Sequence, residues 1–188
     1  MDEKKKYSNP PWDEMLNGEI VLMPSRPANH NKVVGNIRLE LCSQMEILRE
    51  WGVVGGADVF LSEKNRLVPD IVVFRKAFLK GFSIYGVPDL VVEVLSPGSR
   101  NRDRGCKKDL YEKFGVTEYW IVEPEAQIVE VYLLKNGRFR LDDVYEMIPS
   151  DWGLPAEHEI GLFKSEVPAS VFKGISVPLE VIFRNTIE

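Results

Sequence analysis

Two apolar runs of this chain each carry one carboxylate where a buried strand is otherwise wholly aliphatic. Asp70 lies in the run LVPDIVVF, residues 67–74, and Glu93 lies in the run LVVEVL, residues 90–95. An ionised acid among β-branched neighbours loses hydration worth several kcal/mol unless a cation, hydrogen bonds or a raised pKa compensates for it. Because this cost occurs twice, the sequence predicts that a cationic group lies between the two strands.

Length and composition predict one globular domain. With 188 residues, of which 44% are hydrophobic and 28% charged, the chain is long enough to bury a substantial core. We expect a single domain over residues 1–188, with residues 1–11 as a loose polar arm. No run approaches the ~18 consecutive apolar residues of a membrane span, and the start MDEKKK lacks the apolar region of a signal peptide. We therefore expect a cytoplasmic protein without a membrane partner.

Net charge and cysteine content argue against several classes of protein. The net charge of -5 argues against a protein that coats nucleic acid by bulk electrostatics, so any such binding needs a local basic patch. Cys42 and Cys106 form no metal-ligand spacing and are too few for a disulfide scaffold. We expect both as core or semi-buried thiols.

The apolar spacing predicts helices packed against a sheet. Apolar residues at three- and four-residue steps predict a helix over residues 31–50. A second helix is expected over residues 104–114, with Asp103 as its capping residue and Gly115 at its end. This pattern favours an α/β or α+β fold, with a central mixed sheet flanked by helices and with more strands than helices. The predicted strands are residues 18–23, 53–61, 67–74, 89–96, 118–123 and 128–134, the last two as a hairpin.

The chemistry is predicted to lie in residues 67–111. Strand alternation places Asp89 and Glu93 on one face, so that two or three carboxylates converge if the strand with Asp70 pairs beside them. Such sparse oxygen sets bind Mg²⁺ together with water and substrate phosphate oxygens. Lys107 and Tyr111 lie four residues apart on one helix face, so Lys107 can reach back to the acids.

A basic cluster follows the second acid. Five cations stand within nine residues and are opposed there only by Asp103. They predict a phosphate-binding rim on an otherwise acidic protein. The five are Arg100, Arg102, Arg104, Lys107 and Lys108.

A resemblance to a known family covers about residues 12–183. It rests on VPDIVVF and PDLVVEVLSPGSRNRDRGCKKDLYEKFGVTEYWIVEP, and extends to WDEMLNGEIVLMP, PSRPANHNKVVGNI and ASVFKGISVPLEVIF. These segments resemble the PD-(D/E)XK nuclease superfamily and, within it, the bacterial restriction-endonuclease-like Uma2 (Uma-two) family. The resemblance implies a restriction-endonuclease-like core with extra β-hairpins. It also makes Asp70 the first acid of the motif and Glu93 the second.

One position departs from the superfamily pattern, which places a lysine two residues after the second acid. Leu95 stands there, and the resemblance to the Uma2 branch implies that the lysine comes from the following helix. Lys107 is therefore the expected substitute and Lys108 the runner-up. The resemblance implies metal-dependent endonuclease activity, with DNA as the expected substrate. By this resemblance, Asp70 and Glu93 are expected to hold Mg²⁺ or Mn²⁺, and Lys107 is expected to orient the attacking water or to offset developing charge.

Five further residues are candidates for supporting roles: Glu14, His30, Asp89, Asp103 and Tyr111. Tyr111 is expected to position the lysine or a phosphate. Glu14 is either another acid of the site or a surface residue. His30 either caps a helix or contacts the sheet, or it takes part in phosphate or proton chemistry.

Other interpretations stay open. Asp70, Glu93 and Lys107 are also compatible with a buried ion-pair network that only fixes the sheet. A catalytically silent nucleic-acid-binding or protein-interaction module with a nuclease-like core is the alternative function. A glycosidase also needs two acids, but Lys107 and the arginines favour an anionic substrate. Nucleases of this kind that cut both strands often dimerise, so a homodimer stays open as well.

Overall fold

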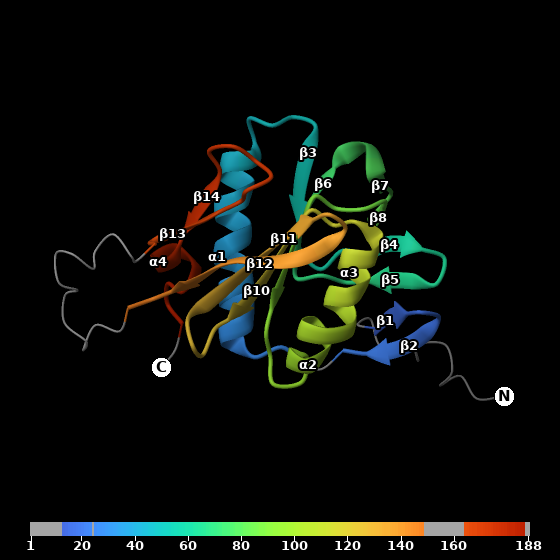
Figure 1. Ribbon diagram of the computed structural model, residues 1–188, viewed down its shortest axis with the longest axis horizontal. Coiled ribbons are helices and arrows are strands. Elements are labelled where there is room, and N and C mark those ends of the chain that lie inside the picture. The colour runs from blue at the N-terminus through green and yellow to red at the C-terminus, as the bar shows by residue number, and fades with distance from the viewer. Residues whose placement is uncertain (1–12, 24, 149–163, 187–188) are drawn as a thin grey trace.

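A central six-stranded sheet organises the molecule, for which a computed structural model describes residues 13–23, 25–148 and 164–186 (Figure 1). The strand order is β12-β11-β10-β9-β6-β3. Only β9 and β10 run parallel, and the other neighbours are antiparallel, so the sheet is mixed, as expected. The strands are β3 (Trp51–Val54), β6 (Ile71–Arg75), β9 (Leu90–Val94), β10 (Glu118–Glu123), β11 (Ile128–Lys135) and β12 (Arg138–Glu146).

A second six-stranded sheet has the order β2-β1-β5-β4-β8-β7, and a short antiparallel pair joins β13 to β14. The extra hairpins expected from the family resemblance are therefore present. The strands of the second sheet are β1 (Asp13–Leu16), β2 (Glu19–Leu22), β4 (Val59–Ser62), β5 (Asn65–Leu67), β7 (Leu79–Lys80) and β8 (Ser83–Tyr85), and the short pair is β13 (Glu166–Pro168) and β14 (Ser176–Pro178).

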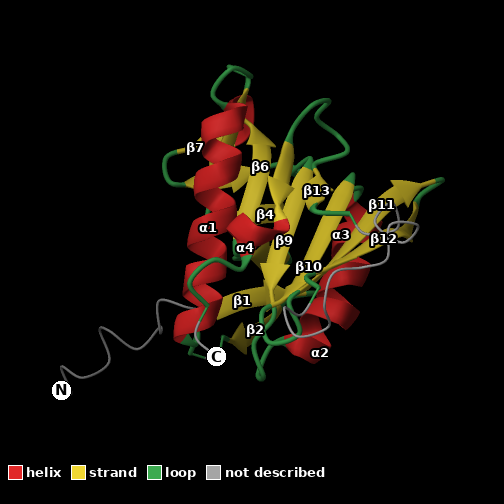
Figure 2. Ribbon diagram, turned by 90° about the vertical axis from the view of Figure 1, so that its left-hand side faces the viewer, coloured by secondary structure: helices red, strands yellow, loops and turns green. Residues whose placement is uncertain are grey.

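Different helices pack on the two faces of the central sheet. Helix α1 (Ala28–Met45) lies on one face and helix α3 (Lys108–Phe114) on the other (Figure 2). Along β9, Val92 packs into the cluster that contains α1, whereas Val91 packs into the cluster that contains α3 and the second sheet. By this alternation Glu93 faces the α3 side. The architecture is α+β, as the sequence predicts.

The first helix differs from the predicted range 31–50. It begins at Ala28 and ends at Met45. The N–H of Leu48 bonds the carbonyl of Met45, and the N–H of Trp51 bonds that of Leu48, so turns lead the chain into β3. Leu48 follows the apolar spacing of the helix but reaches the core from this turn.

The second helical segment is broken, and Asp103 does not cap it. The chain is helical from Arg100, and between α2 (Arg100–Arg102) and α3 lies a π-type turn that is kinked at Gly105, whose backbone is not helical (φ -111°, ψ -109°). Asp103 begins this turn and is buried, so its carboxylate faces the interior. The predicted end at Gly115, which has φ 88°, is confirmed. The π turn is Asp103–Lys107, and the remaining short helices are the 3₁₀ turn Lys76–Phe78 and α4 (Leu179–Ile182).

Two predicted strands, 53–61 and 67–74, each divide between the two sheets. Their breaks meet: the N–H of Gly56 bonds the carbonyl of Pro69 at 3.1 Å. A Cβ on Gly55 would lie 2.7 Å from the carbonyl oxygen of Asp70, so only glycine fits this approach. Asp70 consequently precedes β6 and does not lie inside a strand.

Smaller differences concern segments with weak local signals. The predicted strand 18–23 is part of the β1–β2 hairpin, and β12 is an additional strand. Cys42 and Cys106 are exposed, so the expectation of core or semi-buried thiols was wrong. The expected arm, residues 1–11, lies outside the described residues. Across the described ranges, no helix has the length and apolar character needed to cross a membrane.

Candidate functional site

The two acids of the opening prediction lie on neighbouring chain segments. Strands β6 and β9 pair antiparallel with Ile71 opposite Val92, so one further step places Asp70 opposite Glu93. Both side chains line one cavity, which is also lined by Lys107. The fold therefore brings Asp70, Glu93 and Lys107 to one cavity.

Asp70 is anchored from α1 and from the sheet. Its Oδ2 lies 3.2 Å from His30 Nε2 and accepts the backbone N–H of Val94 at 2.8 Å. Arg26 Nη2 lies 3.0 Å from Oδ1, but Oδ1 accepts no hydrogen bond. Burial alone raises the pKa of the Asp70 carboxyl, but His30 and the Arg26 guanidinium outweigh it and hold that pKa below its ordinary value.

Glu93 is held from the helical side. Lys107 Nζ lies 2.5 Å from its Oε1, and the Tyr111 hydroxyl donates to the same oxygen at 2.7 Å. Burial raises the pKa of Glu93 well above its ordinary value, and the neighbouring acids raise it further against the effect of Lys107. Asp70 and Glu93 thus face each other with their pKa values shifted in opposite directions.

Lys107 is the centre of an acidic cluster and is only 2% exposed. Besides Glu93, its Nζ lies 3.0 Å from Glu14 Oε1 and 3.5 Å from Asp103 Oδ1. Burial lowers the pKa of an amine, but these three acids raise the pKa of Lys107 well above its ordinary value. The π turn sets this contact, because it contains both Asp103 and Lys107.

Of the candidate acids Glu14 and Asp89, only Glu14 lines the cavity. Glu14, on β1, is 1% exposed and also accepts the backbone N–H of Val68 at 2.9 Å, so the surface interpretation was wrong. Asp89 is absent from the cavity wall. Its Oδ2 instead accepts the indole N–H of Trp51 at 3.0 Å. Sharing one strand face with Glu93 does not bring Asp89 to the site, because four residues of β-strand span about 13 Å.

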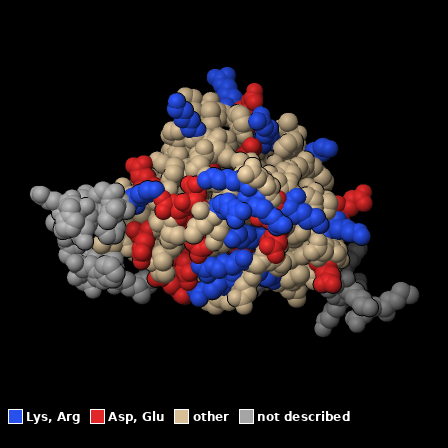
Figure 3. All heavy atoms as spheres, in the orientation of Figure 1, with Lys and Arg blue, Asp and Glu red and all other residues tan. Residues whose placement is uncertain are grey.

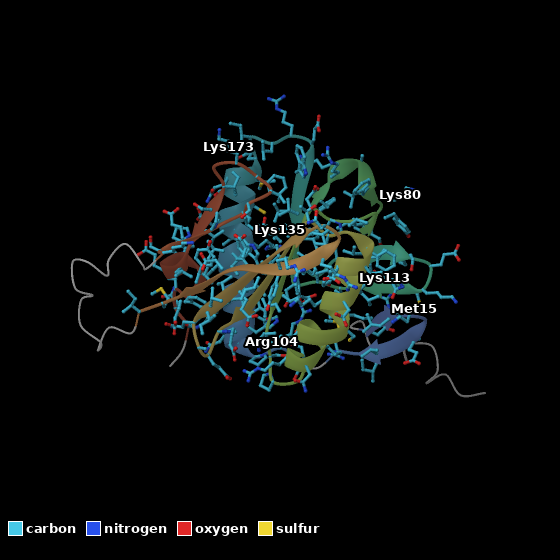
Figure 4. All side chains as sticks on the ribbon, viewed as in Figure 1. Met15, Lys80, Arg104, Lys113, Lys135 and Lys173 are labelled. Carbon is cyan, nitrogen blue, oxygen red and sulfur yellow. The ribbon has the colours of Figure 1, made fainter. Side chains whose placement is uncertain are left out.

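Arg100 and Arg104 of the predicted rim pair with acids that local sequence does not show. Arg100 Nη2 lies 2.7 Å from Glu123 Oε1. Arg104 Nη2 lies 3.0 Å from Glu123 Oε2 and 2.6 Å from Glu130 Oε1. Figure 4 shows Arg104 near the α2 end of the helical segment. Glu123 of β10 and Glu130 of β11 therefore offset the charges of Arg100 and Arg104.

Arg102 and Lys108 have different surroundings. Arg102 lines the acid cavity, and its Nη1 donates to the carbonyl of Leu22 at 3.0 Å. Lys108 Nζ lies 3.5 Å from the ring centre of Tyr132, a cation–π contact. Figure 3 shows Lys and Arg side chains gathered over the face with α3 and β12, with acids beside them. The basic surface is therefore mixed in charge.

The cavity between these groups fits a small hard cation. Its volume is about 20 Å³, and about 10–15 Å³ is enough for one water molecule. Two carboxylate oxygens are available: buried Asp70 Oδ1 accepts no hydrogen bond, and the contacts of Glu93 with Lys107 and Tyr111 are made through Oε1, which leaves Oε2 for a ligand. Oxygen ligands of this kind suit Mg²⁺.

The described residues supply few metal ligands. Within the ranges that the structure describes, no group of three or more His, Cys, Asp and Glu residues is arranged to hold a metal ion. Water and substrate oxygens would have to complete the ligand set of a cation at Asp70 and Glu93, as is common for Mg²⁺. Arg26, which contacts Asp70, was missed at the sequence level because no periodic or motif signal marks it.

Comparisons with known proteins agree with the fold. The model of a family described as "Uma2: Putative restriction endonuclease" matches residues 9–161. The crystal structure of a putative nuclease belonging to DUF820 from Anabaena variabilis has a TM-score of 0.66 and 19% identity over 92% of this chain and 90% of that chain. At this identity the likeness concerns the fold. No curated protein matches the sequence.

A second solved structure is more distant. The type IIG restriction endonuclease BpuSI has a TM-score of 0.37 and 14% identity, over 63% of this chain and 14% of that chain.

Proposed function

This chain belongs to the Uma2 family, and from that premise we propose that it is a metal-dependent endonuclease that hydrolyses nucleic-acid phosphodiester bonds, with DNA as substrate. One observation carries the proposal. Leu95 occupies the motif's lysine position, yet Lys107 from the following helix reaches Glu93 at 2.5 Å beside a cavity that Asp70 also lines. This position supports the proposal that Lys107 supplies the amine that the motif requires.

Asp70 and Glu93 would hold Mg²⁺ or Mn²⁺ through their open oxygens. The bound cation supplies Lewis-acid chemistry at the scissile phosphate. His30 and the Val94 N–H fix Asp70, and Tyr111 fixes Glu93, so the two carboxylates keep their orientation. Preorganised ligands of this kind avoid reorganisation during the reaction.

Lys107 acts as a cation and not as a base. Three acids raise the pKa of its amine well above the ordinary value, so it stays protonated at neutral pH. A protonated amine can hold the attacking water or offset charge that develops on the phosphate. It cannot accept a proton from that water.

The basic rim would contact flanking phosphates. Arg102 and Lys108 are its strongest candidates, because Arg100 and Arg104 already pair with acids. Phosphate contacts make binding salt-dependent, with a slope of about -0.9 per contact on duplex DNA. A homodimer would place two sites on the two strands of a duplex, and the mass of the protein–DNA complex tests this extension.

A nuclease assay tests the proposal. Supercoiled, linear and single-stranded DNA and RNA are incubated with Mg²⁺ or Mn²⁺. We expect DNA cleavage by the wild type, and a loss of about 10²–10³-fold in Glu93→Gln, the range found for removal of one preorganised catalytic group. Glu118→Gln changes another buried acid outside the cavity and is expected to keep cleavage per folded molecule. Unchanged cleavage by Glu93→Gln refutes the assigned role.

One observation favours a second candidate, a catalytically silent nucleic-acid-binding or protein-interaction module. Lys107 is already surrounded by Glu14, Glu93 and Asp103, which is the pattern of a self-contained structural network. Such a module need not bind metal. Mn²⁺ titration tests the two functions, because the proposed nuclease requires Mn²⁺ binding at Asp70 and Glu93 and the silent module does not require it.

A further inference from the structure

Arg26 lies at the mouth of the acid cavity and has no role in the mechanism above. It stands just before α1, and its guanidinium Nη2 is 3.0 Å from Asp70 Oδ1. The Arg26 side chain is 22% exposed, whereas that of Asp70 is 3% exposed. The carboxylate is therefore closed to solvent, whereas solvent reaches part of the Arg26 side chain that contacts it.

The two oxygens of Asp70 are not equivalent. Oδ2 is occupied by His30 and by the backbone N–H of Val94. Oδ1 accepts no hydrogen bond and has the Arg26 charge beside it. A cation that binds Asp70 must therefore approach Oδ1, the oxygen that Arg26 already faces.

A divalent cation and a guanidinium repel each other at one oxygen, since like charges in a poorly screened site raise the energy steeply. Arg26 can relieve this repulsion because it is long and partly exposed. If the Arg26 guanidinium moves outward, its charge stays at the cavity mouth, where a phosphate of the nucleic acid would approach. The planar fork of arginine matches phosphate oxygens and forms two parallel hydrogen bonds with them.

We propose that Arg26 is a resident cation that exchanges with the metal. It occupies Asp70 Oδ1 in the metal-free protein, gives this oxygen up to a divalent cation, and then binds a phosphate of the nucleic acid at the cavity mouth. The second step rests on the proposed function. The charges of the cavity wall support the exchange. Four carboxylates line the cavity together with three cationic side chains, those of Arg26, Arg102 and Lys107. When a divalent cation binds, positive charge exceeds negative charge in the cavity, and the charge of Arg26 is no longer needed there.

Mn²⁺ affinity tests the first step without any cleavage. Calorimetric titration compares the wild type with Arg26→Gln. Arg66→Gln is the control, because Arg66 is 21% exposed and also pairs with acids, Asp13 and Asp58, but lies outside the cavity wall. We expect Arg26→Gln to bind Mn²⁺ about tenfold more tightly, a change of about 1.4 kcal/mol, and Arg66→Gln to match the wild type. Unchanged or weaker binding by Arg26→Gln overturns the exchange.

Oligonucleotide binding in Ca²⁺ tests the second step. Fluorescence anisotropy is measured in Ca²⁺ and in EDTA, so that the gain in affinity caused by the cation is isolated. We expect Arg26→Gln to lose about tenfold of this gain, as for one charge-assisted phosphate contact, while Arg66→Gln keeps it. An equal gain in Arg26→Gln overturns the phosphate contact.

The outcomes separate the exchange from the proposed nuclease. A wild type that binds Mn²⁺ but cleaves nothing refutes the nuclease, while tighter Mn²⁺ binding by Arg26→Gln still supports the exchange. Cleavage together with unchanged Mn²⁺ affinity in Arg26→Gln refutes the exchange alone. If the wild type binds no Mn²⁺, gain of binding in Arg26→Gln supports the resident cation, and failure of both to bind overturns it.

Discussion

Glu93 and Glu118 are buried acids on neighbouring strands of one sheet, but their surroundings differ. Glu118 accepts the Trp120 indole N–H on one oxygen at 2.7 Å and the Val171 N–H on the other at 3.0 Å. Glu93 has Lys107 and Tyr111 on one oxygen, which leaves its other oxygen for a ligand. Burial raises the pKa of both carboxyls.

This difference shows that burial and a raised pKa do not by themselves mark a functional acid. Glu118 has both oxygens satisfied by neutral donors, and it does not line the acid cavity. Its arrangement is complete without a ligand. Glu93 shares the Lys107 amine with Glu14 and Asp103. It also lines a cavity, through which a metal cation can approach it. The open oxygen and the cavity distinguish the two sites.

Removal of the shared cation gives the largest expected effect. Lys107→Met leaves Glu14, Glu93 and Asp103 buried without their amine, which is expected to destabilise the protein by about 3–5 kcal/mol in EDTA. Denaturant unfolding measures it. The control Lys135→Met, at an exposed pair with Asp142, should stay within about 0.5 kcal/mol of the wild type. A loss below about 1 kcal/mol for Lys107→Met would contradict the cluster's dependence on this amine.

Divalent metal should distinguish Glu93 from Glu118. When the free ligand concentration is ~100 times its Kd, binding stabilises the native state by about 2.7 kcal/mol. We expect Mn²⁺ to raise the melting temperature of the wild type and of Glu118→Gln, but not of Glu93→Gln or Asp70→Asn. Equal shifts in all four proteins would place the cation elsewhere.

The same two acids should differ in the metal-free protein. Glu118→Gln turns one acceptor into an N–H donor facing another donor, at a cost of about 1–3 kcal/mol. Glu93→Gln removes one negative charge while Lys107 keeps Glu14 and Asp103, so its stability should equal or exceed that of the wild type. Unfolding in EDTA measures both. A large loss in Glu93→Gln would favour the purely structural network.

The smallest effect concerns pH. Because the folded-state pKa of Glu93 is raised, its contribution to stability is present below the ordinary value of 4.5 and is lost as pH rises through the raised pKa. Asp70 acts oppositely: its pKa is lowered, so its contribution is present above 3.8 and is lost as pH falls through the lowered pKa.

Denaturant unfolding in EDTA between about pH 3 and pH 9, the range in which carboxyls with shifted pKa values titrate, measures both pH dependences. Glu93→Gln should reduce the loss of stability on the rising side, and Asp70→Asn the loss on the acid side. Mn²⁺ should bind more tightly as pH rises, because a ligand carboxyl must release its proton. Mn²⁺ affinity that is independent of pH would exclude Glu93 as a ligand.

Local sequence predicted those parts of the site that depend on short-range pattern. The strand period placed Glu93 on the face that α3 covers, and the helical spacing placed Lys107 and Tyr111 together on Glu93. The strand 118–123 is also found as predicted. The breaks at Gly55 and Asp70 were missed because a continuous apolar run does not show where one strand ends and the chain changes sheets.

The sequence by itself determined the family to which the chain belongs, and it singled out Asp70, Glu93 and Lys107 as candidate site residues. The tertiary structure decided their partners: Arg26 on Asp70, Glu14 on Lys107, and the acids that offset the arginines. These contacts join residues 44, 93, 23 and 26 positions apart in the chain. Periodicity describes neighbours within one helix or strand, whereas ion pairs between elements depend on how the elements pack. Only the folded chain therefore shows which oxygens remain open.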